Sequence, residues 1–144
     1  MTLTTEELTL IRETWTMLAR DPDALTEGFY DELFRRAPEY RPLFAGTDLP
    51  EQRRKLAAAL GLVVKHAHDL RPVVGPLTDL GRRHAEWGVE DAAYDVVGAA
   101  LLHTIAARLG AAMIPGVIEA WTAAYTAVAS TMLAGAATAR KKSA

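Results

Sequence analysis

The 144-residue sequence predicts an all-α fold. Almost every segment places apolar residues three or four positions apart, as helices do, and no stretch alternates polar and apolar residues long enough to predict a strand. Apolar residue types make up 50% of the chain and charged types 24%, which fits a globular protein. Because this length suits one domain, we expect residues 1–144 to form a single unit.

The first two helices are predicted from their caps. Thr4 and Glu7 have the spacing of a capping box, and Asp21 with Pro22 ends the first helix and begins the second. The first helix is expected to direct inward Leu8, Ile11, Trp15 and Leu18. The second should bury two adjacent rows, Leu25, Phe29 and Leu33 beside Thr26, Tyr30 and Phe34. Residues 37–44 are too interrupted by proline for a long helix.

Two further helices follow in the middle of the chain. Asp48, with Glu51 three residues later, caps a helix whose expected buried stripe is Leu49, Gln52, Leu56, Ala59, Leu60 and Val63. After the interruption at Arg71 and Pro72, a helix places on one face Val73, Leu77, Leu80, His84 and Trp87. Gly88 is expected to end it.

The last two helices are expected at about 90–109 and 115–138. The former ends at Gly110 and directs inward Tyr94, Val97, Leu101 and Ile105. The latter presents Ile118, Trp121, Tyr125, Val128 and Met132. We expect a disordered basic tail from about 139 to 144, so the fold contains six substantial helices and one short one.

Charge and residue usage exclude several classes of function. The net charge is −2 with both signs dispersed, so neither nucleic acid nor an anionic membrane is an expected partner. The absence of cysteine excludes disulfides, thiolate metal sites and covalently attached haem. The uncharged run at 56–64 is far shorter than the roughly 20 residues that cross a bilayer, and the N-terminus lacks signal-peptide features. We therefore expect a cytoplasmic protein, monomeric or homodimeric.

Three polar residues interrupt the apolar stripes: Tyr30, Gln52 and His84. Each alone is more often structural, since such a histidine is usually a satisfied core residue, a tyrosine can bury its ring, and a glutamine can lie at the solvent margin. Together the three residues suggest a functional site. A neutral imidazole can bind a metal, while a phenol and an amide can hydrogen-bond a small polar molecule, as in a haem site with one protein ligand and one open position.

The remaining histidines are expected to be structural. His66 and His68 do not share a helix face, and His66 lies about 21 Å along the helix from Gln52, too far to be a second axial ligand. His103 is expected in the core or at the solvent edge. We expect Trp15, Trp87 and Trp121 to be packing residues rather than electron relays, and at least one of the arginines at 82 and 83 to face water.

From about Thr5 to Met132 the sequence resembles the bacterial globins, especially the flavohaemoglobin-like and single-domain haemoglobins. The matching pieces are Phe29-Tyr30-x-x-Leu33-Phe34, Pro38-Glu39-x-Arg41-Pro42-Leu43-Phe44, Gln52-x-x-Lys55-Leu56, Gly81-Arg82-Arg83-His84-x-x-x-Gly88-Val89, Tyr94-x-Val96-Val97-Gly98-x-x-Leu101-Leu102 and Ala120-Trp121-x-x-Ala124-Tyr125. The resemblance implies a globin fold of six to eight helices around a haem b pocket that binds a diatomic gas.

The resemblance also implies roles for individual residues. His84 corresponds to the proximal iron ligand, and Tyr30 and Gln52 to the residues that stabilise the bound gas. The short segment before Gln52 leaves Arg53 as an alternative, although the apolar register favours Gln52. The implied cofactor-binding residues are Phe44, Leu56, Leu80, His84, Val89 and Tyr94.

One position departs from the family pattern. In flavohaemoglobin-type globins the proximal histidine belongs to a network with a tyrosine and a glutamate of the last helix. Tyr94 matches the tyrosine, but Ala136 falls at the glutamate position, and Glu86 points away from His84. A carboxylate partner makes the imidazole a stronger electron donor, so its loss argues against peroxidase-like chemistry.

The implied function is reversible binding of O2, with CO and NO as further ligands, at a five-coordinate iron and with high affinity. A second hypothesis is a nitric oxide dioxygenase, in which Tyr30 and Gln52 would be catalytic. It would need a separate reductase, because we expect this length to leave no room for one. The others are a haem-based gas sensor acting through a partner protein and a haem-free helical interaction protein.

Overall fold

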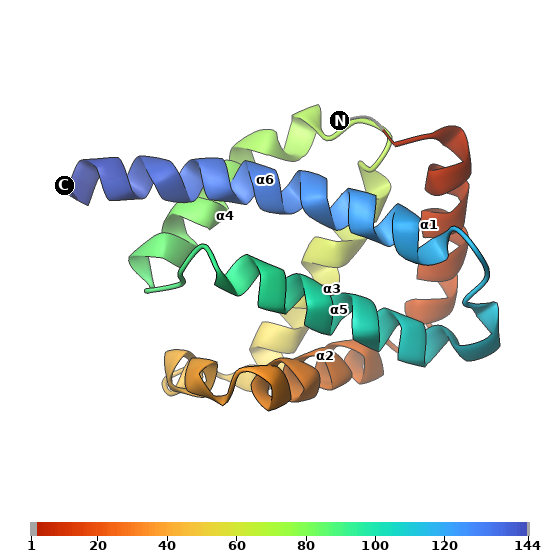
Figure 1. Cartoon of the computed structure of the whole chain (residues 1–144), viewed down its shortest axis with the longest axis horizontal. Coiled ribbons are helices and arrows are strands. Elements are labelled where there is room, and N and C mark those ends of the chain that lie inside the picture. Colours follow the sequence, from red (N-terminus) through yellow and green to blue (C-terminus); the bar gives the residue numbers. More distant parts are fainter. Residues whose placement is uncertain (1–2, 144) are drawn as a thin grey trace.

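The computed structural model describes residues 3–143, with side chains as far as residue 141. Its elements are α1 (Thr5–Leu18), α2 (Pro22–Arg36), the 3-10 helix η1 (Pro38–Phe44), α3 (Leu49–Lys65), α4 (Arg71–Glu86), α5 (Ala93–Leu109), the 3-10 turn η2 (Gly110–Ala112) and α6 (Val117–Ser143) (Figure 1). The described residues include no strand, so the predicted all-α fold is confirmed.

The predicted N-terminal caps are present. Thr4 and Glu7 form a reciprocal capping box, in which the Glu7 amide donates to Thr4 Oγ1 at 3.0 Å and the Thr4 amide donates to Glu7 Oε1 at 2.9 Å. Asp21 accepts from the Ala24 amide at 3.0 Å, and Asp48 caps α3 in the same way. Local sequence therefore determines where these helices begin.

The last two helices begin later than predicted. The amides of Ala93 and Tyr94 donate to the carbonyls three residues earlier, which is a turn, so α5 begins at Ala93 rather than residue 90. Gly116 has a φ of +92°, outside the right-handed helical region, so α6 begins at Val117 rather than residue 115.

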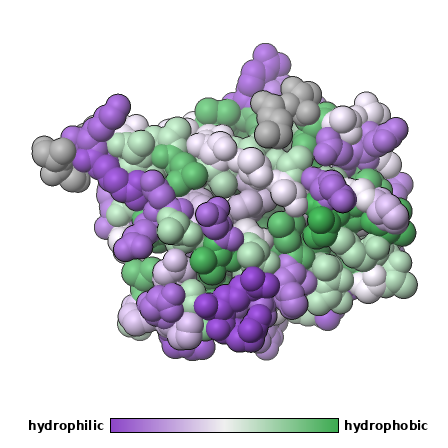
Figure 2. All heavy atoms as spheres, in the orientation of Figure 1, coloured by the Kyte–Doolittle hydropathy of each residue, from purple (hydrophilic) through white to green (hydrophobic). Residues whose placement is uncertain are grey.

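The expected disordered tail is wrong for residues 139–143, because α6 continues to Ser143. Arg140 Nη1 lies 2.5 Å from Asp91 Oδ1, and Nη2 donates to the Val89 carbonyl at 3.4 Å. These contacts tie the last turns of α6 to the connection between α4 and α5. The C-terminal end projects beyond the body of the molecule and carries a hydrophilic surface (Figures 1 and 2).

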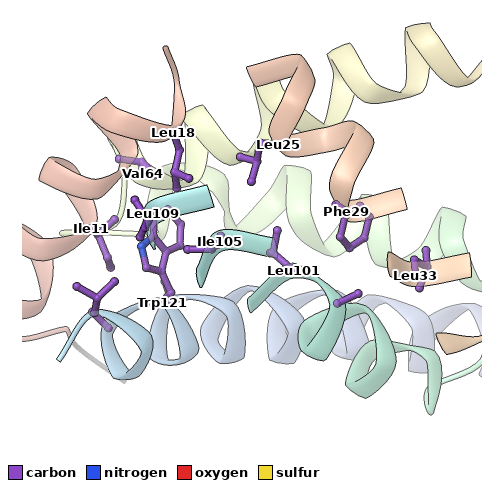
Figure 3. Packing of buried hydrophobic residues seen from close by; sticks show 14 of the residues in the cluster. Ile11, Leu18, Leu25, Phe29, Leu33, Val64, Leu101, Ile105, Leu109 and Trp121 are labelled. Carbon is purple, nitrogen blue, oxygen red and sulfur yellow. The ribbon is translucent and has the colours of Figure 1, made fainter. Parts of the chain in front are cut away.

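The main core lies where α1, α2, α5 and α6 meet (Figure 3). Its fully buried side chains include Ile11, Leu25 and Ile105. Trp121 packs among them, and its indole Nε1 donates to Thr14 Oγ1 at 2.9 Å, so the single polar atom of the ring is satisfied.

One helical stretch, Ala93–Ala112, is long and apolar enough to span a membrane by length and composition alone. In this structure it is α5 with η2, and α5 packs against α2 and α6 (Figure 1). It contributes Ala100, Leu101 and Ile105 to the core. A central helix of a globular domain is also apolar, because it contacts other parts of the protein on most of its sides. We interpret α5 in this way.

Several residues are less buried than predicted. Leu8 and Trp15 are half-buried on α1, and Ala59 is exposed on α3. Gln52, Leu56, Leu60 and Val63 are half-buried, because α3 packs mainly against α2 and one edge of α1. Trp87, also expected to be a packing residue, is 60% exposed and lies outside the core cluster, whereas Trp121 is buried and Trp15 packs against the core.

Glu32 is a buried carboxylate on α2, held by two arginines of the same helix. Its oxygens accept from Arg35 at 2.5 and 2.9 Å and from Arg36 at 2.7 Å. The hydrogen bond from Arg35 is the main cause that lowers the pKa of Glu32 to about 2. Because its partners are charged, this carboxylate can be ionised although little of its side chain is exposed.

Two glycines bring α4 and α6 into backbone contact. A Cβ added to Gly81 of α4 would lie 1.9 Å from the Met132 carbonyl oxygen, and one added to Gly135 of α6 would lie 1.9 Å from the Thr78 carbonyl oxygen. Only glycine permits this approach from both sides. The crossing lies one turn before His84 and fixes the position of that part of α4.

Candidate functional site

An aromatic cluster surrounds Tyr30 on α2. The ring centroids of Phe29 and Phe44 lie 4.9 and 5.6 Å from that of Tyr30, both with edge-to-face geometry. Phe34 lies 6.1 Å from Tyr30 and 5.3 Å from Phe44, so η1 is anchored on α2 through these rings. Tyr30 is therefore held in one orientation by packing.

The structure brings Gln52 to the hydroxyl of Tyr30. Burial raises the pKa of Tyr30, and a hydrogen bond from the Gln52 side chain opposes that rise. The neighbouring Arg53 turns to α2 instead, where its Nε donates to Asp23 Oδ1 at 3.2 Å. Of the two residues considered from the sequence, Gln52 is thus the one beside Tyr30.

On α4, one ring nitrogen of His84 makes a hydrogen bond and the other is free to act as a ligand. Its Nδ1 lies 2.8 Å from the Leu80 carbonyl oxygen. Because a carbonyl only accepts, Nδ1 carries the proton, and in the neutral ring Nε2 keeps its lone pair. Burial lowers the pKa of His84, which favours the neutral form, while the bond to Leu80 opposes the shift.

The segment that carries Phe44 meets the end of α4. A Cβ added to Gly88 would lie 3.8 Å from Leu43 Cδ2. Leu43, which precedes Phe44, and Gly88, which precedes Val89, are therefore within contact distance. Gly88 has a φ of +93°, which turns the chain away from α4 at this point. The cluster around Tyr30 and the helix of His84 therefore approach one another at this edge.

The apolar residues predicted for the site are half-buried. Leu56 lies on α3, Leu80 on α4, Val89 in the connection after α4, and Phe44 at the end of η1. Stripes of this kind, which protein atoms cover only in part, suit contact with an additional apolar group.

Tyr94 has no visible partner for its hydroxyl. The residue is 8% exposed, and its Oη neither donates nor accepts a hydrogen bond within the part of the chain that the structure describes. Burial raises its pKa. Ala136, at the position of the family glutamate, is 1% exposed and offers no polar atom in its side chain. The structure thus contains a buried phenol of the kind that the predicted network would use, with no hydrogen bond to a carboxylate among the described residues, although the charge of Asp91 also raises its pKa.

The charged residues near His84 are paired with each other on α4. Arg82 contacts Asp79 and Glu86, each at 2.5 Å, and Arg83 contacts Asp79 at 3.2 Å. Glu86 is therefore engaged by Arg82, in agreement with the expectation that it points away from His84. His103, far along α5, is exposed and lies 3.8 Å from Glu32.

The donor set suits haem better than a free metal ion. Residues 3–143 contain no group of three His, Cys, Asp or Glu side chains that could hold an ion. A single neutral histidine is sufficient for a metal that already has four ligands from a porphyrin. The half-buried stripes and the free Nε2 of His84 fit such a group.

Trp87, which the sequence analysis placed on the same helix face as His84, is the aromatic neighbour of that histidine. Its ring centroid lies 5.2 Å from that of His84, at an interplanar angle of 42°. The three-residue spacing predicts that the two rings share a helix face. Its exposure could not be predicted, because it depends on which other elements cover that face.

The Globin family model matches residues 27–132. A flavohemoprotein of Burkholderia sp. (strain TH2) is 32% identical over 134 residues, which are 91% of this chain and 34% of that protein. The chain spans about a third of the length of the curated relatives it matches.

Solved structures give the same result for the fold. A bacterial globin from Campylobacter jejuni superposes with a TM-score of 0.86 at 26% identity, covering 96% of this chain and 99% of that one. A flavohemoglobin from Malassezia yamatoensis, determined with bound FAD and heme, gives a TM-score of 0.78 at 24% identity, covering 98% of this chain and 37% of that one.

Proposed function

Because the chain belongs to the globin family, we propose that it binds haem b through His84 and reversibly holds O2, with CO and NO as further ligands. Globins bind haem and small gases. The single observation that carries the assignment of the ligand is the hydrogen bond from His84 Nδ1 to the Leu80 carbonyl, which leaves Nε2 available for iron. A cytoplasmic location is part of this proposal.

The bound haem supplies an iron atom with one open coordination position for a diatomic gas. Phe44 would pack on the haem face, and Leu56, Leu80 and Val89 would form apolar walls. Such walls keep water away from the site, and hydrogen bonds to a polar ligand are stronger where water is excluded.

Tyr30 and Gln52 would stabilise the gas by hydrogen bonding. A phenol is protonated at neutral pH, and burial raises the pKa of Tyr30 further, so that its hydroxyl can donate. A hydrogen bond to a charged group contributes ~1.5–3 kcal/mol. This corresponds to roughly a 10- to 150-fold slower release of a ligand that carries partial negative charge, and we therefore expect high O2 affinity.

The surroundings of His84 favour binding over bond-breaking chemistry. Its imidazole donates to a backbone carbonyl, and the buried Ala136 provides no carboxylate for Tyr94. A neutral carbonyl partner increases the electron donation of the ring less than a carboxylate does. We therefore place reversible binding ahead of peroxidase-like activity.

A second candidate function is nitric oxide dioxygenase. The similarity to proteins named flavohemoproteins favours it. Each turnover would consume one electron, which a reductase would have to provide. Tyr30 and Gln52 would then orient the gas for reaction with NO.

Optical spectra test the proposal. The purified protein, with haem added in equal amount, should show a Soret band, a CO complex after reduction, and an oxygenated spectrum that persists in air. His84→Leu should abolish this spectrum, whereas His103→Leu, a matched change at an exposed histidine, should leave it unaltered. If haem does not bind, or if His84→Leu binds it as well as the unaltered chain, the proposal fails.

A further inference from the structure

An arginine of α3 contacts the first turn of α2. Arg53 Nε donates to Asp23 Oδ1 at 3.2 Å, although the two residues are 30 positions apart in the sequence. The side chain of Arg53 is only 22% exposed, whereas that of Asp23 is 69% exposed. The long stem of Arg53 therefore lies along the protein surface, with its charged end at a carboxylate of another helix.

The other charged contacts at the start of α3 are local. Asp48 accepts from the Glu51 amide at 3.2 Å, and Glu51 pairs with Arg54, whose side chain is 70% exposed. Contacts of this kind determine where the helix begins, but not how it lies against its neighbours. Among the ion pairs of the described residues, the pair of Arg53 and Asp23 is the one that joins α2 and α3.

Two neighbouring residues of α3 contact the same face of α2. Asp23 and Tyr30 are seven positions apart, which is nearly two helical turns, so they share a face and lie about 10.5 Å apart along the axis. Gln52 reaches Tyr30, and Arg53 reaches Asp23. The preceding connection, residues 45–48, is exposed and lies outside the helices. A single contact would leave α3 free to turn about its axis, whereas two contacts at separate points oppose that rotation.

The hydrogen bond at Tyr30 makes this orientation important. The bond from Gln52 acts to lower the pKa of the phenol against the effect of burial, so the amide donates and the phenol oxygen accepts. The proton of the phenol then remains available for a bound gas. If the amide moved away, the phenol oxygen would lose its partner and the hydroxyl would no longer be held in one direction.

We propose that Arg53 is a positioning residue for the gas site: its ion pair with Asp23 fixes the rotation of α3 and so keeps the Gln52 amide at the phenol. This inference rests on the proposed function. In this role Arg53 does not contact the gas and acts through Gln52 alone. Its effect on O2 release should therefore disappear when Gln52 is replaced.

The expected effect is limited by the strength of the ion pair. Arg53→Met, which keeps the stem and removes the charge, should speed O2 release about 1.4- to 5-fold, since an exposed pair contributes ~0.2–1 kcal/mol. Asp23→Asn, at an exposed residue, should speed release by the same factor, and the two changes together should do no more than either alone. Arg53→Lys, which keeps the charge, should retain most of the slow release.

Two controls separate this role from a general effect on α3. Arg54→Met removes the neighbouring arginine, whose ion pair lies within the helix, and should leave O2 release unchanged. In a Gln52→Leu chain, Arg53→Met should have no further effect, because no amide is left to position. A merely structural arginine would instead change release equally with and without Gln52.

Three measurements on the haem-loaded proteins test the proposal. O2 release is followed by stopped flow. The C–O stretching band of the CO complex, recorded in the infrared, is a second readout, because it reports the polar groups beside the bound gas and does not depend on a rate. Urea unfolding of the two single variants and of the double variant, at one haem concentration, measures the ion pair itself.

The proposal is supported if Arg53→Met and Asp23→Asn speed O2 release and shift the CO band, and if neither change does so in the Gln52→Leu chain. It is overturned if the release rate or the CO band of Arg53→Met matches that of the unaltered chain, if its effect is the same without Gln52, or if the stability losses of the two single variants simply add. A protein that shows no Soret band with added haem overturns the proposed function as well, and the spectrum identifies that case.

Discussion

Replacing Gly81 by alanine tests the close crossing of α4 and α6. The added Cβ would lie 1.9 Å from the Met132 carbonyl oxygen and 2.6 Å from its Cα, whereas real Cβ contacts are essentially never below 3.0 Å. The obstacle is backbone, so no side-chain rotation relieves it. The two helices must separate, and the turn that carries His84 must move with α4.

Gly81→Ala has two opposing effects on the free energy of unfolding. Overpacking a well-packed contact costs ~1–3 kcal/mol, and a backbone obstacle belongs at the upper end. Removing a helix-interior glycine returns ~0.5–1 kcal/mol. The expected net loss is about 2 kcal/mol, which lowers the melting temperature of a domain of this size by about 6–7 °C.

Gly61→Ala is the matched control, because a Cβ there would lie 3.6 Å from Trp15 Cζ2, an ordinary contact. It should stabilise the protein by ~0.5–1 kcal/mol. Both variants are unfolded in urea at one fixed haem concentration, since haem binding adds to stability, and unfolding is followed by circular dichroism. If Gly81→Ala is as stable as the unaltered chain, α4 and α6 do not meet as described.

Three further outcomes are expected. Tyr30→Phe should speed O2 release at least about tenfold, and an unchanged stopped-flow rate would remove the role assigned to that hydroxyl. Thr14→Val leaves the buried indole donor of Trp121 without its partner and should cost ~1–3 kcal/mol in urea unfolding, whereas Thr16→Val, at an exposed hydroxyl of the same helix, should cost little. Glu32 has a lowered pKa of about 2, so its contribution to stability is present above its ordinary pKa of 4.5 and is lost as the pH falls from 4.5 towards 2. Stability measured against pH should therefore fall less steeply for Glu32→Gln in that window, and parallel curves would contradict this.

The starts of α1, α2 and α3 and the end of α4 were predictable because their causes are local. The Thr4 and Glu7 capping box, the Asp21 cap and the turn at Gly88 each involve atoms within a few residues along the chain. The polar interruptions at Tyr30, Gln52 and His84 were visible for the same reason, since helical spacing alone gives the face on which each lies. The roles of these three residues remain predictions.

The C-terminal end of α6 was not predictable in the same way. Residues after 138 carry helix-compatible types, and the contact of Arg140 with Asp91 joins positions 49 residues apart. A composition rich in alanine and basic residues therefore did not distinguish a free tail from a helix end held by another segment.

The sequence by itself determined an all-α chain with caps, turns and three polar residues on apolar faces, because hydrogen bonds along one helix depend on near neighbours. Only the tertiary structure decided which of Gln52 and Arg53 faces Tyr30, because Asp23 on another helix holds Arg53. It also decided that Trp87 is exposed and that the Tyr94 hydroxyl is without a partner among the described residues. Burial and pairing of this kind depend on segments that are distant along the chain and meet only after folding.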